Sequence, residues 1–148
     1  AIIAASELND GIDKLVTWAA IDDIPSRYGE FDENWKKNGV KYVENGRTGQ
    51  QMPLYFQLYS DILANRQRFD LEKVLEDFGI PMLICHGDAD PTVDVTAAFN
   101  LNNFNIDADL LVVKGGNHVF GGSHPYQASS LPLPMQEVII RTVDFIND

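Results

Sequence analysis

Ile-Cys-His-Gly-Asp-Ala-Asp-Pro-Thr-Val at residues 84–93 is the most informative stretch of this sequence, together with Gly-Gly-Asn-His at residues 115–118. Each stretch completes or follows an apolar run, residues 80–85 in the first case and residues 108–113 in the second. Short apolar runs bounded by turn residues are typical of strands buried on both faces of a parallel sheet. The two stretches therefore predict two strands, each followed by a loop with polar side chains.

The polar side chains just past these strands are those that a hydrolase uses. Asp90 follows the first strand and His118 follows the second, and the interval leaves room for one helix and one strand. A carboxylate beside a histidine orients the imidazole and stabilises its charged form, as a general base requires. The sequence has no Gly-x-Ser-x-Gly motif, the mark of one large class of nucleophilic serines. Asp90 and His118 are therefore predicted as the acid and base of a site whose nucleophile is missing here.

Length, composition and charge limit the remaining possibilities. A chain of 148 residues with 45% hydrophobic content can bury one core, so it is one domain or part of one. The formal charge of −11, from 22 acidic against 11 basic residues, argues against nucleic-acid and anionic-membrane partners. The single cysteine, Cys85, lies within an apolar run and is predicted as a core residue rather than a reactive thiol.

The N-terminal segment looks like the middle of a helix rather than the start of a protein. Residues 1–8 are mostly small and apolar, and the Asn-Asp-Gly at residues 9–11 is a helix stop signal. We therefore expect the sequence to begin inside a larger protein. A cytoplasmic location is expected, but not on the basis of this N-terminus. No apolar run approaches the roughly 20 residues of a membrane span.

Strands and helices alternate along the rest of the chain. A third strand is predicted at residues 14–20, which are apolar and rich in β-branched residues. This alternation predicts an α/β fold with a three-stranded parallel sheet, its strands in sequential order and helices on both faces. The predicted helices cover residues 1–8, 53–65, 71–78, 92–103 and 134–146.

Residues 26–52 differ in character and are predicted as a small lobe inserted into the domain. They are aromatic, charged and interrupted by glycines, and Asn45-Gly46 predicts the turn of a hairpin whose first strand is 40–43. Pro53 is predicted as the first residue of the following helix. Arg47 could bind a substrate carboxylate or hold the hairpin, and this stays open. The aromatic residues could line a pocket, but packing of the lobe is favoured; they are Tyr28, Phe31, Trp35, Tyr42, Tyr55, Phe56 and Tyr59.

The two stretches quoted first give the chain a resemblance to the C-terminal half of an α/β-hydrolase, of the dienelactone-hydrolase and acyl-peptidase-like type. The family pattern at the catalytic acid is a strand followed by His-Gly-x-x-Asp-x-x-Val, which matches residues 86–93. The pattern at the base is a strand followed by a small-residue loop ending in histidine, which matches residues 115–118. The resemblance covers nearly the whole chain and implies that Asp90 and His118 belong to a Ser-His-Asp triad.

The same resemblance defines what is missing. In the family, the nucleophilic serine lies at a sharp turn after a strand and before a helix rich in small residues, and residues 1–5 resemble that helix. The serine is then expected a few residues upstream of Ala1. Both usual oxyanion donors would also lie outside this sequence. The chain alone is therefore expected to be inactive, with neither metal nor cofactor required by the chemistry.

Other residues compete for these roles. Asp90 could simply cap a helix beginning near Thr92, and Asp88 and Asp94 are alternative carboxylates at the turn and on the first helical turn. The alternatives to His118 are two further histidines. His86 lies at the turn after the strand, where a packed, hydrogen-bonded role is expected, and His124 precedes a proline in the following loop. A zinc site is disfavoured by the spacing of the histidines and the cysteine.

Two functions from different classes are consistent with these observations. The first is the C-terminal portion of a serine hydrolase for a small-molecule ester or a peptide-like substrate (ester, amide or thioester), with its serine upstream. The second is a non-catalytic binding or interaction domain that keeps the fold without the serine. Ser123 lacks the strand-turn-helix context of a nucleophile. Because strand 14–20 would lose its neighbour, we expect self-association or pairing with the N-terminal half of the same protein.

Overall fold

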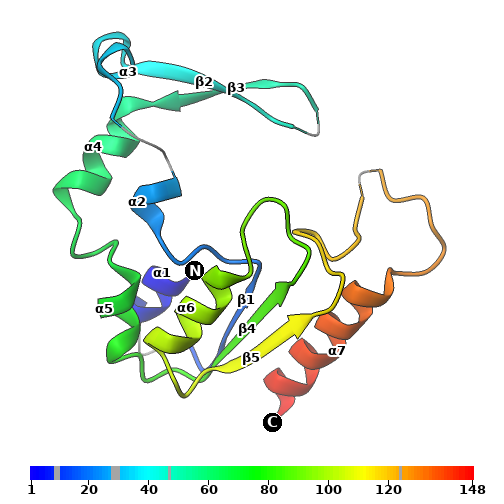
Figure 1. Ribbon diagram of the computed structural model, residues 1–148. Helices are drawn as coiled ribbons and strands as arrows, with labels where there is room; N and C mark the ends of the chain where they lie inside the picture. The colour runs from blue at the N-terminus through cyan, green and yellow to red at the C-terminus, as the bar shows by residue number, and fades with distance from the viewer. Residues whose placement is uncertain (9–10, 28–30, 47, 124) are drawn as a thin grey trace. The chain divides into compact units, whose positions relative to one another are not determined.

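The structure is a computed structural model that describes residues 1–8, 11–27, 31–46, 48–123 and 125–148. The chain forms two compact units (Figure 1). The first unit comprises Ala1–Asp22 and Leu71–Asp148, and the second comprises Asp23–Asp70. The second unit extends beyond residues 26–52, the range expected for the inserted lobe. In the described residues, no helix is long and apolar enough to cross a membrane.

The first unit contains the predicted three-stranded parallel sheet. Its strands are β1 (Leu15–Trp18), β4 (Met82–Gly87) and β5 (Asp109–Val113), in the order β1-β4-β5, so the predicted α/β class and sequential order are confirmed. Strand β4 lies two residues later than predicted, because His86 and Gly87 still pair with the last two residues of β5. His86 therefore belongs to the strand rather than to the turn after it, which corrects the sequence prediction.

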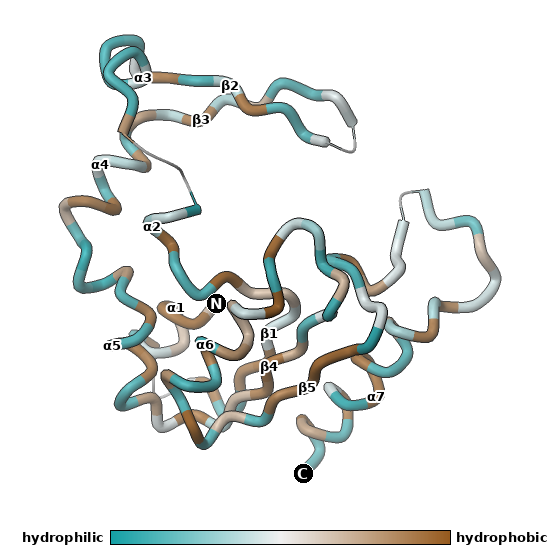
Figure 2. Tube along the Cα trace, in the orientation of Figure 1, coloured by the Kyte–Doolittle hydropathy of each residue, from teal (hydrophilic) through white to brown (hydrophobic). Residues whose placement is uncertain are grey.

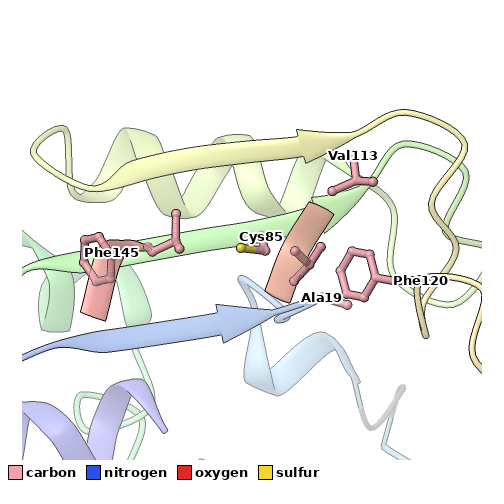
Figure 3. Packing of buried hydrophobic residues seen from close by; sticks show 7 residues of the cluster. Ala19, Cys85, Val113, Phe120 and Phe145 are labelled. Carbon is pink, nitrogen blue, oxygen red and sulfur yellow. The ribbon is translucent and has the colours of Figure 1, made fainter. Parts of the chain in front are cut away.

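The central strand β4 is buried along its whole length, as its sequence predicts. Side chains alternate between the two faces of a strand. Leu83 and Cys85 join a core with Val138 and Phe145 of helix α7 (Leu133–Asn147), shown in Figure 3. The opposite face of β4, which includes His86, is covered by helix α6 (Thr96–Phe104), since α6 contacts both β4 and β5. Figure 2 shows the hydrophobic residues gathered along β4 and β5.

Two shorter helices complete the first unit. Helix α1 (Ile2–Leu8) contacts helix α5 (Leu71–Glu76), which in turn contacts α6. Helix α5 ends two residues earlier than predicted, and a turn closed by the Phe78 amide on the Leu75 carbonyl follows it. The residues predicted to stop α1, at positions 9 and 10, lie outside the described residues.

In its described residues, the second unit contains three helices and a two-stranded antiparallel sheet. Its helices are α2 (Ile24–Arg27), α3 (Glu33–Asn38) and α4 (Phe56–Ala64), and its strands are β2 (Val40–Glu44) and β3 (Gln51–Tyr55). The predicted hairpin is present, but the two-residue turn at Asn45-Gly46 is wrong, since residues 45–50 connect the strands. The assignment of Pro53 to the start of a helix is also wrong, because Pro53 lies in β3 opposite Tyr42. Arg47 lies outside the described residues.

Four aromatic side chains of the second unit pack against one another. Trp35 is buried, and its indole N–H donates to the Leu54 carbonyl at 2.8 Å. Phe31, Phe56 and Tyr59 contact one another, and Phe56 and Tyr59 also contact Trp35, with ring centroids between 5.5 and 6.1 Å apart. Packing therefore accounts for these four residues, as the sequence favoured. The remaining members of the set are Tyr42 and Tyr55, which are exposed, and Tyr28, which lies outside the described residues.

Cys85 is a core residue, as predicted, and we expect its thiol to be unreactive in the folded protein. Its side chain is fully buried. Burial raises the pKa of the Cys85 thiol to about 11, so the buried thiol is protonated at pH 8. A colorimetric disulfide reagent at pH 8 should detect no thiol in the native chain and one after urea denaturation. Rapid labelling of the native chain would contradict this burial, and Cys85→Ala provides the blank.

Candidate active site

Asp90 lies in the loop that follows β4 and organises that loop around its own carboxylate. Its Oδ1 accepts hydrogen bonds from the Thr92 amide at 2.7 Å and the Val93 amide at 3.1 Å. These two bonds hold residues 90–93 in a turn, and helix α6 does not begin near Thr92 as predicted. It begins at Thr96, whose amide donates to Asp94 Oδ1 at 2.9 Å. Asp94 therefore precedes the helix rather than lying on its first turn.

His118 lies in the loop after β5 and is hydrogen-bonded to the other oxygen of the same carboxylate. The distance from its Nδ1 to Asp90 Oδ2 is 2.8 Å, which confirms the hydrogen bond expected from the sequence. The Asp90 side chain is fully buried, whereas 38% of the His118 side chain is exposed. Solvent therefore reaches the imidazole, while the protein encloses the carboxylate that orients it.

The hydrogen bonds to Asp90 keep its carboxyl group ionised. Burial alone raises the pKa of Asp90, but the hydrogen bonds from the Thr92 and Val93 amides and from His118 outweigh it, and they hold the pKa below its ordinary value. An ionised carboxylate can only accept hydrogen bonds, so Nδ1 of His118 carries a proton. In the neutral imidazole, Nε2 is then the unprotonated nitrogen and has the lone pair that a general base needs.

The loops that carry Asp90 and His118 are joined to each other by hydrogen bonds. The Ala89 amide donates to the Gly116 carbonyl at 3.0 Å, and the Gly115 amide donates to Asp88 Oδ1 at 2.5 Å. Gly87 and Gly116 approach so closely that a Cβ on Gly87 would lie 2.1 Å from the Gly116 carbonyl oxygen. Gly87 is therefore required sterically, and the close approach fixes the separation of the two loops.

The loop beyond His118 has its own supports. Asn117 Oδ1 accepts hydrogen bonds from the Val119 amide at 3.1 Å and the Gly121 amide at 2.8 Å. Phe120 is buried in the core beside Ala19, with its ring 5.9 Å from that of Trp18. Its φ of 50° is unusual for a residue with a side chain. The turn formed by the Asn117 side chain and the buried Phe120 ring thus fix the chain on either side of His118. The sequence patterns did not predict these contacts.

The competing residues have other roles or positions. Asp88 holds the two loops together, as described above, and its carboxylate accepts from the Gly115 amide, whereas the carboxylate bonded to His118 is that of Asp90. His86 is fully buried, with Nε2 3.0 Å from the Val93 carbonyl oxygen, so the packed, hydrogen-bonded role expected for it is confirmed. Its Nε2 also lies 3.5 Å from Asp90 Oδ2, a proximity that the four-residue spacing in the motif could have suggested. His124 lies outside the described residues.

The arrangement pairs an accessible imidazole with a carboxylate that orients it. None of the serine, threonine or cysteine side chains described is hydrogen-bonded to Nε2 of His118. Ser123 is exposed, five positions further along the same loop. No group of three or more histidine, cysteine, aspartate or glutamate side chains in the described part of the chain could hold a metal ion. Chemically, the site can accept a proton at Nε2 and stabilise the resulting charge.

Comparisons with known proteins identify the fold. Neither a family model nor a curated protein matches the sequence. Among solved structures, a putative hydrolase from Agrobacterium vitis S4 matches with a TM-score of 0.71 and 21% identity over 98% of this chain and 56% of its own. Alpha/beta hydrolase domain-containing protein 10 from mouse matches with a TM-score of 0.70 and 15% identity, over 99% of this chain and 56% of its own.

Est1E from Butyrivibrio proteoclasticus is a third match, with a TM-score of 0.67 and 20% identity over 99% of this chain and 56% of its own. The chain therefore has an α/β-hydrolase fold, which confirms the resemblance seen in the sequence. It spans about half the length of the solved proteins that it matches. This is consistent with the expected C-terminal half of the fold.

Proposed function

We propose that this chain is the C-terminal portion of a serine hydrolase and supplies the base and the orienting carboxylate of a Ser-His-Asp triad. The observation that carries this proposal is the 2.8 Å hydrogen bond between His118 Nδ1 and the buried Asp90 carboxylate, with the imidazole partly open to solvent. A buried carboxylate paired with an accessible imidazole is what a general base requires. The fold of the esterase and hydrolase structures that match this chain supports a hydrolase in general terms.

The proposed reaction assigns one task to each residue. Nε2 of His118 takes the proton from a serine hydroxyl as that oxygen attacks the substrate carbonyl carbon, and the carbonyl oxygen becomes negative. Asp90 stabilises the imidazolium that forms. The tetrahedral intermediate then breaks its bond to the leaving group, which takes the proton from Nε2. Water repeats the sequence and releases the acid, so the enzyme ends unchanged and no cofactor is consumed.

The serine and the oxyanion donors come, in this proposal, from a segment that precedes this sequence in the same protein. Strand β1 offers a place for it, because no other described strand pairs with its outer edge. Unpaired backbone groups on a strand edge favour pairing with a further strand. We propose the N-terminal half of the hydrolase as that partner. In its absence, a second copy of the chain is expected to occupy the edge.

A comparison of two proteins tests the proposal. The chain alone should neither hydrolyse a simple aryl ester nor react with a serine-directed fluorophosphonate, because it lacks the nucleophile. The longer protein encoded by the same gene should do both, and the label should map to a serine preceding Ala1. Labelling of the 148-residue chain would show that its nucleophile is internal. A longer protein that binds the probe or its substrates without turnover would instead favour the non-catalytic binding domain.

A further inference from the structure

A second histidine contacts the Asp90 carboxylate from inside the fold. His86 is the last residue but one of β4, and its side chain is fully buried. Its Nε2 lies 3.0 Å from the Val93 carbonyl oxygen and 3.5 Å from Asp90 Oδ2, the oxygen that also accepts from His118. The carboxylate thus lies between two imidazoles, one enclosed by the core and one open to solvent.

The hydrogen bonding of His86 determines which of its nitrogens carries a proton. A carbonyl oxygen only accepts, so the bond to Val93 requires a proton on Nε2. Nδ1 of His86 is buried and has no hydrogen-bond partner among the described residues. A buried polar atom without a partner costs free energy, which phenylalanine at this position would avoid. The presence of histidine at position 86 despite this cost indicates that the hydrogen bond from its Nε2 to the Val93 carbonyl has a function.

That interaction closes a ring of contacts around Asp90. The Val93 amide donates to Asp90 Oδ1, while the Val93 carbonyl accepts from His86. Residue 93 is therefore held at both of its peptide groups, once by the carboxylate and once by the strand. Strand β4 is the central strand and is buried throughout, so the His86 imidazole has a fixed position. The hydrogen bond to Val93 holds the loop of residues 90–93 against it.

We propose, on the basis of the function proposed above for Asp90 and His118, that His86 is a positioning residue of the active site. Its Nε2–H ties the Val93 carbonyl to β4 and thereby directs Oδ2 of Asp90 toward His118. His86 acts through Asp90 and touches neither the substrate nor the reacting atoms. The role is specific for a donor at the position of Nε2, which distinguishes it from simple filling of the core.

The first test uses the wild-type chain and needs no catalysis. Nitrogen chemical shifts of the ¹⁵N-labelled chain report which imidazole nitrogen carries the proton. We expect His86 with a proton on Nε2 and His118 with a proton on Nδ1 that exchanges slowly with water. Finding His86 with an unprotonated Nε2 would overturn the proposal, because the bond to Val93 could then not exist.

A matched pair of variants tests the positioning itself. In His86→Gln the side-chain amide nitrogen can reach the place of Nε2, whereas in His86→Asn it is one methylene short and lies nearer the place of Nδ1. We expect His86→Gln to keep the exchange rate of the His118 Nδ1 proton within about threefold of wild type, and His86→Asn to raise it about tenfold or more. Asp90→Asn, which removes the partner carboxylate, sets the upper limit of the effect.

The outcomes separate this inference from the proposed function. Equal exchange rates in His86→Gln and His86→Asn, with both variants folded by circular dichroism, would reduce His86 to a core residue. In the longer protein, His86→Asn should lower kcat about tenfold with KM unchanged, and His86→Gln should largely restore it. A longer protein without hydrolase activity would contradict the proposed function, while the exchange measurement on the chain would still decide the role of His86.

Discussion

If the proposed function holds, replacing His118 by alanine in the longer protein should lower kcat by about 10⁴- to 10⁶-fold, the range seen when the base of a triad is removed. The reason is that Nε2 of His118 is the only proton acceptor that the described residues place at the site with its partner nitrogen bonded to a buried carboxylate. KM should change little, because the imidazole acts in the transition state rather than in binding. Initial rates with an aryl ester measure both constants.

A series of variants separates the roles of the site residues. Asp90→Asn should cost less than His118→Ala, about 10⁴-fold in kcat, because the base remains but loses its orienting charge. Combining both changes should add little to the His118→Ala effect, since the residues act as a unit. Ser123→Ala is the matched control from the same loop and should leave kcat within about twofold. A His118→Ala enzyme that retained a tenth of wild-type activity would remove His118 from the mechanism.

Residues with local sequence signals were predicted well. Each of the three strands is a short apolar run, which is typical of parallel sheets, and the central strand β4 is buried along its whole length. The pairing of Asp90 with His118 followed from the rule that side chains at the carboxyl ends of neighbouring parallel strands meet at one edge of the sheet. The structure has β4 and β5 as neighbours, as this reasoning requires.

Residues whose structure depends on distant partners were predicted poorly. Pro53 has the local preference of a helix start, but the pairing of β3 with β2 determines its conformation, and a proline is tolerated in such a two-stranded sheet because both strands are edges. Thr92 was predicted to begin a helix, but it lies in a turn formed around the Asp90 carboxylate, which is bonded to the distant His118, and the helix begins at Thr96. In each case a specific hydrogen bond or strand pairing outweighs a weak local preference.

The close approach of Gly87 and Gly116 is another contact between distant residues that the sequence did not predict. It leads to a prediction for the stability of three glycine variants. A methyl group on Gly87 would lie 2.1 Å from the Gly116 carbonyl oxygen and 2.4 Å from its carbonyl carbon, both of them backbone atoms. Backbone cannot give way as a flexible side chain does, so the two loops must separate. We expect Gly87→Ala to lower the free energy of unfolding by about 3 kcal/mol, the upper end of what overpacking usually costs.

Two further glycines provide the scale for this measurement. A Cβ on Gly116 would meet its nearest atom at 3.1 Å, so Gly116→Ala should cost about 1 kcal/mol. A Cβ on Gly79 would meet nothing within 4 Å, so Gly79→Ala should be neutral or stabilising by up to about 1 kcal/mol. Urea denaturation of the 148-residue chain measures all three variants. Equal stabilities for Gly87→Ala and Gly79→Ala would show that the loops carrying Asp90 and His118 are not held together at this contact. The hydrogen bond between those residues would then need another support, since the Ala89 amide and the Gly116 carbonyl are brought into reach by the same approach.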